Sequence, residues 1–134
     1  MSKNIVIVAT NFHKKYMEIM IKEAGTAALE HGLSIIQEIW VPGCYEVPLA
    51  LKRTFALKNI DGAVVLGIIE KGQTKHGLVM GTVVHSAIIQ LELETGKPVG
   101  MGILGPEILP KQIPSRLRSY AKRAVLALAT MLTI

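Results

Sequence analysis

The chain has 134 residues, half of them hydrophobic, a single cysteine and a formal net charge of +5. This length allows one compact domain over residues 1–134 and leaves no room for a second. One cysteine excludes an internal disulfide, and no paired Cys/His spacing is typical of a zinc site. The first apolar run is too short for a signal peptide, and no segment reaches the roughly 20 apolar residues that cross a bilayer. We therefore expect a cytoplasmic protein with no metal and no membrane partner.

The positive charge alone does not predict binding to nucleic acid. Lysines and arginines are spread along the chain, and aromatic residues make up only 4% of it. A polynucleotide site would need stacking platforms or a dense basic stripe. A small anionic ligand such as a phosphate ester needs only a few arginines, so the composition favours that class of ligand.

Apolar runs that predict strands alternate with helical patterns along the chain. The strands are expected at residues 5–9, 34–41, 62–69 and 99–104, and the helices at about 14–31, 46–57, 74–94 and 115–132. Gly32 and Gly96 stand where helix C-terminal caps are expected, and Pro42-Gly43 and Gly105-Pro106 predict turns. This alternation predicts a three-layer αβα sandwich with a four-stranded parallel sheet. Its helices are unusually apolar for so small a sheet, which indicates that some apolar surface lies between subunits.

The segment from Gly67 to His76 joins the third predicted strand to the third helix. In an open parallel sheet, ligands bind at the carboxyl ends of the strands, and a helix that begins there attracts anions. His76 lies at this helix start, where an imidazole can transfer protons near neutral pH. A lone histidine is also compatible with a surface role. His85 cannot join the same site, because nine residues at about 100° each place it on the opposite helix face.

Motifs along the whole chain resemble those of the lumazine synthase family. Residues 72–76 (GQTKH) match its glycine-x-threonine-x-histidine signature, and Asn11-Phe12 follow the first strand as its aromatic turn does. Residues 41–48 (VPGCYEVP) resemble its VPG-x-[FY]-E-[IVL]-P segment, and residues 93–99 (LETGKPV) its ETG-x-PV segment. Residues 112–116 (QIPSR) resemble its Q-A-x-x-R arginine motif.

The resemblance implies a flavodoxin-like fold and a condensation in riboflavin biosynthesis. 5-Amino-6-(D-ribitylamino)uracil would join 3,4-dihydroxy-2-butanone 4-phosphate to give 6,7-dimethyl-8-ribityllumazine, with loss of phosphate and water. No cofactor is implied. The reaction needs orientation, a phosphate anchor and proton transfer, and the resemblance makes His76 the catalytic residue.

The resemblance also implies a site for ribitylaminouracil. Phe12 would stack on the pyrimidine, Glu46 would accept hydrogen bonds from ribityl hydroxyls, and Met101 would form a wall. Each also has a plain structural reading: a loop aromatic that closes the core, a carboxylate favoured by the helix dipole, and a core methionine. The full predicted set is Phe12, Cys44, Tyr45, Glu46, Ile68, Ile69, Glu70 and Met101.

A phosphate site is implied by the backbone of Gln73 and Thr74 together with Arg116, whose guanidinium would form a fork to the phosphate. The alternative is a surface arginine near a helix start, which the helix dipole slightly disfavours. Lys122 is a further candidate by resemblance, although its spacing is shorter than in the family. In the family, Met101 and Arg116 would face the other site residues from a neighbouring chain of a pentamer.

Three departures from the family pattern concern substrate contacts and assembly. His13 replaces an asparagine, Gly77-Leu78 replaces an aromatic-acidic pair, and the glycine-asparagine-lysine-glycine loop after Arg116 is absent, as in shorter archaeal-type members. Pentamers could stay free, pair or close into an icosahedral shell, and riboflavin synthase is a candidate partner. Two other functions remain open: an archaeal-type riboflavin synthase, against which His76 argues, and a non-catalytic flavin- or lumazine-binding shell protein.

Overall fold

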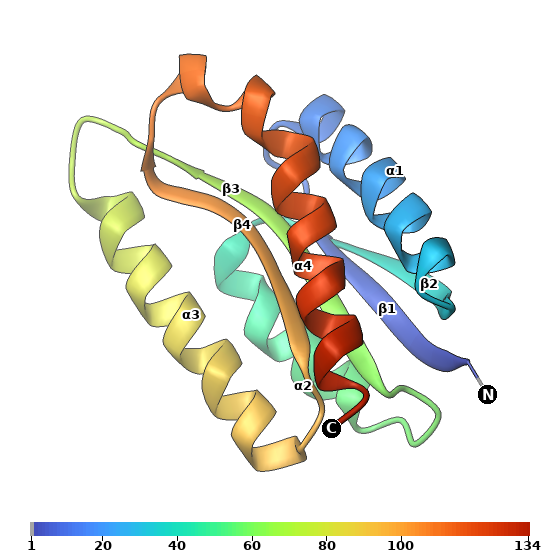
Figure 1. Cartoon of the computed structure of the whole chain (residues 1–134). Helices are drawn as coiled ribbons and strands as arrows, with labels where there is room; N and C mark the ends of the chain where they lie inside the picture. Colours follow the sequence, from blue (N-terminus) through green and yellow to red (C-terminus); the bar gives the residue numbers. More distant parts are fainter. Residues whose placement is uncertain (1) are drawn as a thin grey trace.

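Four parallel strands form one sheet at the centre of the computed structural model, which describes residues 2–134 (Figure 1). In space they lie in the order β2-β1-β3-β4. Their bounds are β1 (Lys3–Thr10), β2 (Leu33–Val41), β3 (Gly62–Glu70) and β4 (Val99–Ile108). The four predicted strands are confirmed, and the order reverses direction between β1 and β3.

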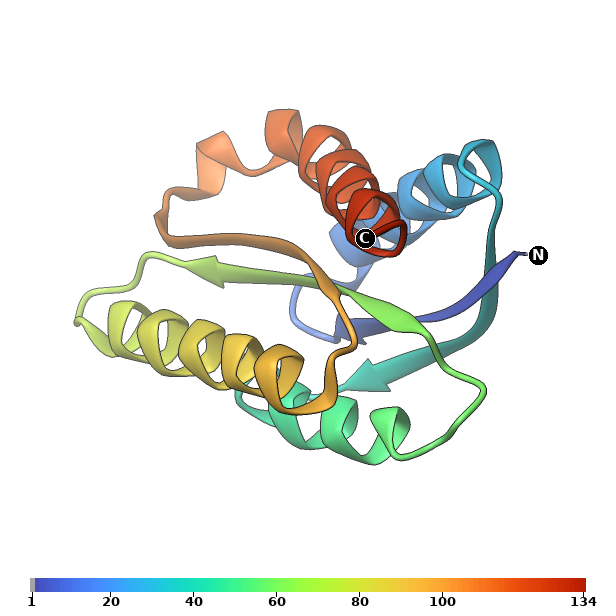
Figure 2. The same ribbon diagram turned by 60° about the horizontal axis from the view of Figure 1, so that its bottom comes forward.

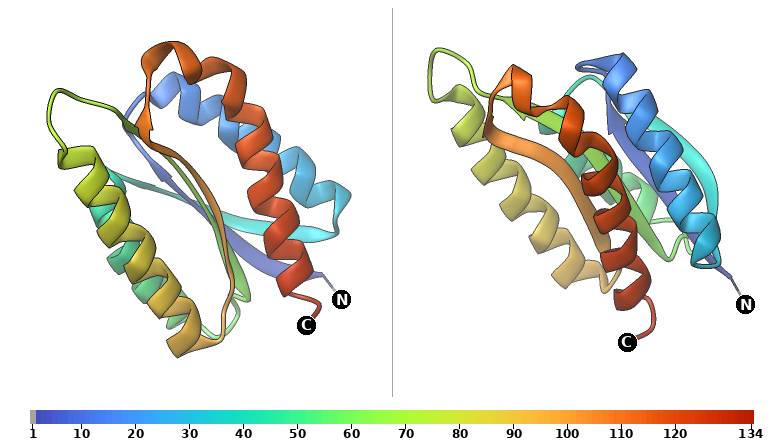
Figure 3. Two further views of the ribbon diagram at one scale, coloured as in Figure 1. Left: turned by 60° about the vertical axis from the view of Figure 1, so that its left-hand side comes forward. Right: turned by 45° about the horizontal axis from the view of Figure 1, so that its top comes forward.

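Two helices cover each face of the sheet, as the edge-on view in Figure 2 shows. One layer holds α1 (Lys14–Glu30) and α4 (Leu117–Met131), and the other holds α2 (Val47–Phe55) and α3 (His76–Thr95). Figure 3 shows the same separation from two further sides. Short 3-10 turns, η1 (Cys44–Glu46), η2 (Pro110–Gln112) and η3 (Pro114–Arg116), precede α2 and α4. The predicted three-layer αβα sandwich is confirmed.

Alternation along the strands divides the apolar core into two parts. In β1, Ile5 and Ile7 face α1 and α4, whereas Val6 and Val8 face α2 and α3. Every residue of β3 except Glu70 is buried, as expected for a central parallel strand covered on both faces. The side of the sheet on which a strand residue lies therefore follows from its parity.

The predicted turn at Gly105-Pro106 is wrong, because β4 continues through it to Ile108. Ile68 pairs with Leu104 and Glu70 with Ile108, so residues 105–107 bulge opposite Ile69 alone. Gly105 has φ +90° there, and an added Cβ would meet the carbonyl oxygen of Ile69. The bulge accommodates the proline without ending the strand.

Helix boundaries agree with the prediction to within a few residues. The helix α3 begins at His76 rather than near Thr74, so Gln73 and Thr74 lie in the loop before it. Gly96 caps its end in the left-handed conformation, with φ 71°, as predicted. None of the helices within residues 2–134 is long and apolar enough to cross a membrane.

Candidate active site

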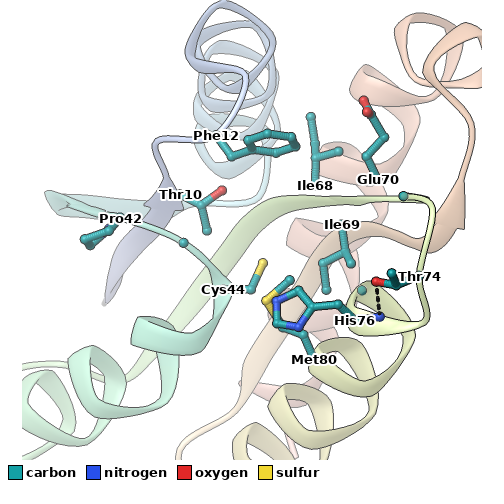
Figure 4. A pocket seen from close by; sticks show the side chains of 13 residues that line it. Thr10, Phe12, Pro42, Cys44, Ile68, Ile69, Glu70, Thr74, His76 and Met80 are labelled. Carbon is teal, nitrogen blue, oxygen red and sulfur yellow. Dashed lines mark hydrogen bonds between the residues drawn. The ribbon is translucent and has the colours of Figure 1, made fainter.

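A cavity of about 380 Å³ lies at the carboxyl ends of β1, β2 and β3, on the side of the sheet covered by α2 and α3. This is the point where the strand order reverses, which is where open α/β sheets bind ligands. Figure 4 shows how side chains from four separate segments meet there. The lining residues are Thr10, Phe12, Pro42, Gly43, Cys44, Ile68, Ile69, Glu70, Gly72, Thr74, His76, Gly77 and Met80.

His76 is the first residue of α3 and lies at the cavity wall. Its ring lies with its centroid 5.9 Å from that of Tyr45 in an edge-on arrangement, and its backbone N–H donates to the hydroxyl of Thr74 at 3.3 Å. Within residues 2–134 its imidazole makes no hydrogen bond, and the side chain is exposed. The two ring nitrogens are therefore available to a ligand.

The start of α3 lies close to the end of β3 because residue 77 is glycine. An added Cβ at Gly77 would come within 3.2 Å of Cγ2 of Ile69 and 3.3 Å of the carbonyl oxygen of Glu70. A larger residue would require Ile69 or the first helical turn to shift by a few tenths of an ångström. Gly77 thus permits close packing of the first turn of α3, in which His76 lies, against the end of β3.

Glu70, in the cavity lining, makes a contact that the sequence did not predict. Nε2 of His13 lies 2.9 Å from Oε1 of Glu70, which links the loop after β1 to the end of β3. His13 has a left-handed backbone with φ 56°, and its ring lies 4.2 Å from that of Phe12, centroid to centroid. Phe12 remains 46% exposed. The pair holds the aromatic ring at the edge of the cavity.

Cys44 lies in the cavity wall at the start of η1, and its side chain is buried. Burial, and secondly the negative charge of Glu46, raise the pKa of this thiol from 9.0 to about 11. The thiol is therefore protonated at neutral pH, and a nucleophilic role is not favoured. Cys44 therefore contributes to the site by forming part of the cavity wall and by offering a thiol that hydrogen-bonds weakly.

Seven of the predicted site residues line the cavity, and six do not. Phe12, Cys44, Ile68, Ile69, Glu70, Thr74 and His76 line it. Three of the other six lie near it. Tyr45 contacts the ring of His76, and Glu46 is the last residue of η1, close to Gly43. Gln73 is exposed in the loop before α3.

The remaining three lie elsewhere on the same chain. Met101 lines a separate hollow at the β4 edge with Tyr120 and Arg123. Arg116 ends η3, where its Nη1 donates to the carbonyl oxygen of Gln112 at 2.9 Å. Lys122 is exposed on α4. One chain therefore does not bring these three residues into the cavity that contains His76.

The side chains of the cavity that the predicted set lacks include Thr10 and Met80. Met80 follows His76 by four residues, so the helical repeat places both on one face. Thr10 precedes Phe12 by two residues and ends β1 on the same side as Val6 and Val8. Both could have been found from these periodicities once the site had been placed. No group of three His, Cys, Asp or Glu side chains that could hold a metal ion occurs in the described part of the chain.

Comparison with known proteins gives one consistent result. The family model described as 6,7-dimethyl-8-ribityllumazine synthase matches residues 2–134. A protein of that name from Staphylothermus marinus is 37% identical over 96% of this chain and 85% of its own length. Those from Methanopyrus kandleri and Pyrobaculum arsenaticum are 36% and 33% identical, over 93% and 90% of this chain and 88% and 81% of their own lengths.

Proposed function

This chain belongs to the 6,7-dimethyl-8-ribityllumazine synthase family, and we propose that it uses the cavity described above to carry out the family reaction. It is a transferase of riboflavin biosynthesis. It condenses 5-amino-6-(D-ribitylamino)uracil with 3,4-dihydroxy-2-butanone 4-phosphate to give 6,7-dimethyl-8-ribityllumazine, phosphate and water. The observation that carries the proposed site is the imidazole of His76, which makes no hydrogen bond within residues 2–134 and lies at a helix start in the wall of a cavity at the sheet's switch point.

We assign proton transfer to His76. Imine formation requires a proton to leave the attacking amine and a hydroxyl to leave as water, and phosphate elimination requires removal of a proton next to the imine. A histidine that is exposed to the cavity and makes no side-chain hydrogen bond within residues 2–134 is suited to accept and return these protons. The edge contact with Tyr45 restricts its ring.

We assign the apolar part of the cavity to the pyrimidine. Phe12 offers a ring face at the mouth, and backbone groups of Ile68, Ile69 and Glu70 lie at the end of β3, where they can pair with the polar edge of the ring. The His13–Glu70 contact supports this, because it gives the Glu70 carboxylate a partner within the chain and leaves the backbone groups for the ring. The ribityl chain would then extend toward Cys44, Tyr45 and Glu46 in η1.

We assign the phosphate to the loop before α3, where Gln73 and Thr74 lie, together with Arg116 and Lys122. These two cations, and Met101 as a wall residue, are proposed to come from a neighbouring copy of the chain. Two observations support this: none of the three lines the cavity of its own chain, and α3 exposes apolar side chains that lack cover. Those side chains are Leu78, Val79, Val83, Ile89 and Leu93.

A closed ring of identical head-to-tail contacts would cover this surface and complete each site from two chains. We propose a cytoplasmic homopentamer, either free or assembled further into pairs or an icosahedral shell. Riboflavin synthase, which would consume the product, remains a candidate partner.

The direct test is to supply the purified protein with both substrates and follow the lumazine product by its absorbance, with the spontaneous reaction subtracted. Turnover well above the spontaneous rate supports the proposal. If the protein binds lumazine or flavin without turnover, the non-catalytic alternative is right. If it converts the lumazine to riboflavin instead, it is a riboflavin synthase.

A further inference from the structure

The hydroxyl of Thr10 is the one buried side-chain oxygen or nitrogen that finds no hydrogen-bond partner among residues 2–134. Thr10 is fully buried, with 0% exposure, and it lines the cavity. A buried polar group without a partner costs about 1–3 kcal/mol, and such groups are rare in native structures. The Thr10 hydroxyl therefore contributes no hydrogen bond to the stability of the folded chain within residues 2–134.

The position of Thr10 on β1 places its side chain on the face of the sheet that carries the cavity. Residues of even number on β1 face α2 and α3, and the two before it on that side are Val6 and Val8. A third valine would have the same shape and would leave no oxygen unpaired. Figure 4 shows the hydroxyl of Thr10 between Phe12 and Cys44.

The side chains of Thr10 and Cys44 both lie next to Gly67 of β3. An added Cβ at Gly67 would lie 3.1 Å from Sγ of Cys44 and 3.4 Å from Oγ1 of Thr10. Cys44 opens η1, which ends at Glu46, and Oε1 of Glu46 lies 3.6 Å from the Cβ position of Gly43 in the cavity lining. Thr10 thus lies next to the wall that continues into η1, and Figure 4 shows it across the cavity from Thr74 and His76.

We propose that the Thr10 hydroxyl is a binding residue for the ribityl chain and forms a hydrogen bond with one of its hydroxyl groups. This rests on the proposed function, because it takes ribitylaminouracil as the ligand. A polyol hydroxyl both donates and accepts, as the threonine hydroxyl does, so the two satisfy each other in either direction. Thr10 then selects for the sugar chain, whereas Phe12 and the end of β3 select for the ring.

The test compares two ligands and two pairs of variants by equilibrium binding. The ligands are 5-amino-6-(D-ribitylamino)uracil and 5,6-diaminouracil, which is the same pyrimidine without the ribityl chain. Thr10→Val removes the hydroxyl and keeps the shape, and Thr10→Ser keeps the hydroxyl. Should Thr10→Val fail to fold, Thr10→Ala against Thr10→Ser makes the same comparison, since that pair differs only in the hydroxyl.

We expect Thr10→Val to weaken ribitylaminouracil about three- to tenfold, the value of one hydrogen bond, and to leave 5,6-diaminouracil unchanged. Thr10→Ser should bind both ligands as the wild type does. The melting temperature of free Thr10→Val should rise by a few °C, because an unpaired buried hydroxyl is lost.

Equal effects on the two ligands, or no effect on either, would overturn the inference. So would a lower melting temperature with unchanged binding, which would mean that the hydroxyl serves the fold. A wild-type protein that binds neither pyrimidine would overturn the proposed function itself. The two kinds of failure are distinguishable. If only the role of Thr10 is wrong, the wild-type protein still binds ribitylaminouracil; if the proposed function is wrong, it does not.

Discussion

Replacement of His76 by alanine separates a proton-transfer role from a structural one. The side chain is exposed, makes no hydrogen bond within residues 2–134 and touches Tyr45 only edge to ring, so its removal should leave the fold intact. The edge contact is worth at most about 1 kcal/mol, which corresponds to a few °C in melting temperature. The expected rise in the activation barrier is larger than this loss of stability. General acid–base catalysis contributes roughly 10² to 10⁴ in rate, which corresponds to about 3–5 kcal/mol.

The assay is steady-state formation of the lumazine, with each substrate varied in turn. We expect kcat to fall by roughly 10² to 10⁴ while both KM values change less than about threefold, because the imidazole acts in the transition state. Residual activity above the spontaneous rate should survive, since the cavity still orients both substrates. His31→Ala is the matched control. It is the same change at the far end of α1, where Nδ1 of His31 donates to the carbonyl oxygen of Ala27 of the same helix at 2.8 Å.

Wild-type kcat in His76→Ala would remove this residue from the mechanism. An equal loss in His31→Ala would show that the effect is not local to the cavity. A large rise in KM with unchanged kcat would instead make His76 a binding residue.

Two further predictions concern Arg116 and Cys44. Arg116→Ala should raise the KM for the butanone phosphate about 10- to 100-fold, the value of charge-assisted hydrogen bonds, and change that for ribitylaminouracil less than about threefold. Arg116→Lys should recover only part of this, because the charge remains but the fork is lost; equal weakening of both substrates would contradict the assignment. The pKa of Cys44 is raised from 9.0 to about 11 in the folded chain, so the folded state favours the protonated thiol. This stabilisation is fully present below pH 9 and is lost as the pH rises toward 11, and about 1 kcal/mol should disappear between pH 8 and pH 10. Denaturant unfolding at both pH values should therefore show a steeper alkaline loss for wild type than for Cys44→Ala; parallel losses would contradict the pKa shift.

Local patterns were sufficient for most of the fold. The apolar run of β3 and the glycine cap at Gly96 are short-range signals, and both elements form where they were predicted. The course of β4 was not predictable in the same way. Proline and glycine at 105–106 normally break a strand, but here pairing with β3 resumes at Ile108 and holds the chain in line. That pairing is a tertiary contact, which overrides the local turn signal.

The site was predictable where a motif marks it and not where only packing defines it. His76 was identified from its place at the start of a helix and by resemblance, and Cys44 by resemblance alone; both line one cavity. Thr10 looked like an ordinary strand residue, because threonine favours strands and its missing partner is visible only in three dimensions. The contact between His13 and Glu70 also joins residues 57 positions apart, so no local pattern marks it.

The proposal that most closely joins fold, chemistry and assembly is that each site takes His76 from one chain and Arg116 from its neighbour. The measurement is the activity of mixed assemblies, formed by unfolding and reassembling equal amounts of His76→Ala and Arg116→Ala chains, with mixing confirmed by mass. Random mixing around a closed ring gives about one quarter of the sites a wild-type histidine and a wild-type arginine, so activity should rise toward about one quarter of the wild-type value. If confirmed mixed assemblies are no more active than the two variants measured separately, the site is not shared and both residues act within one chain.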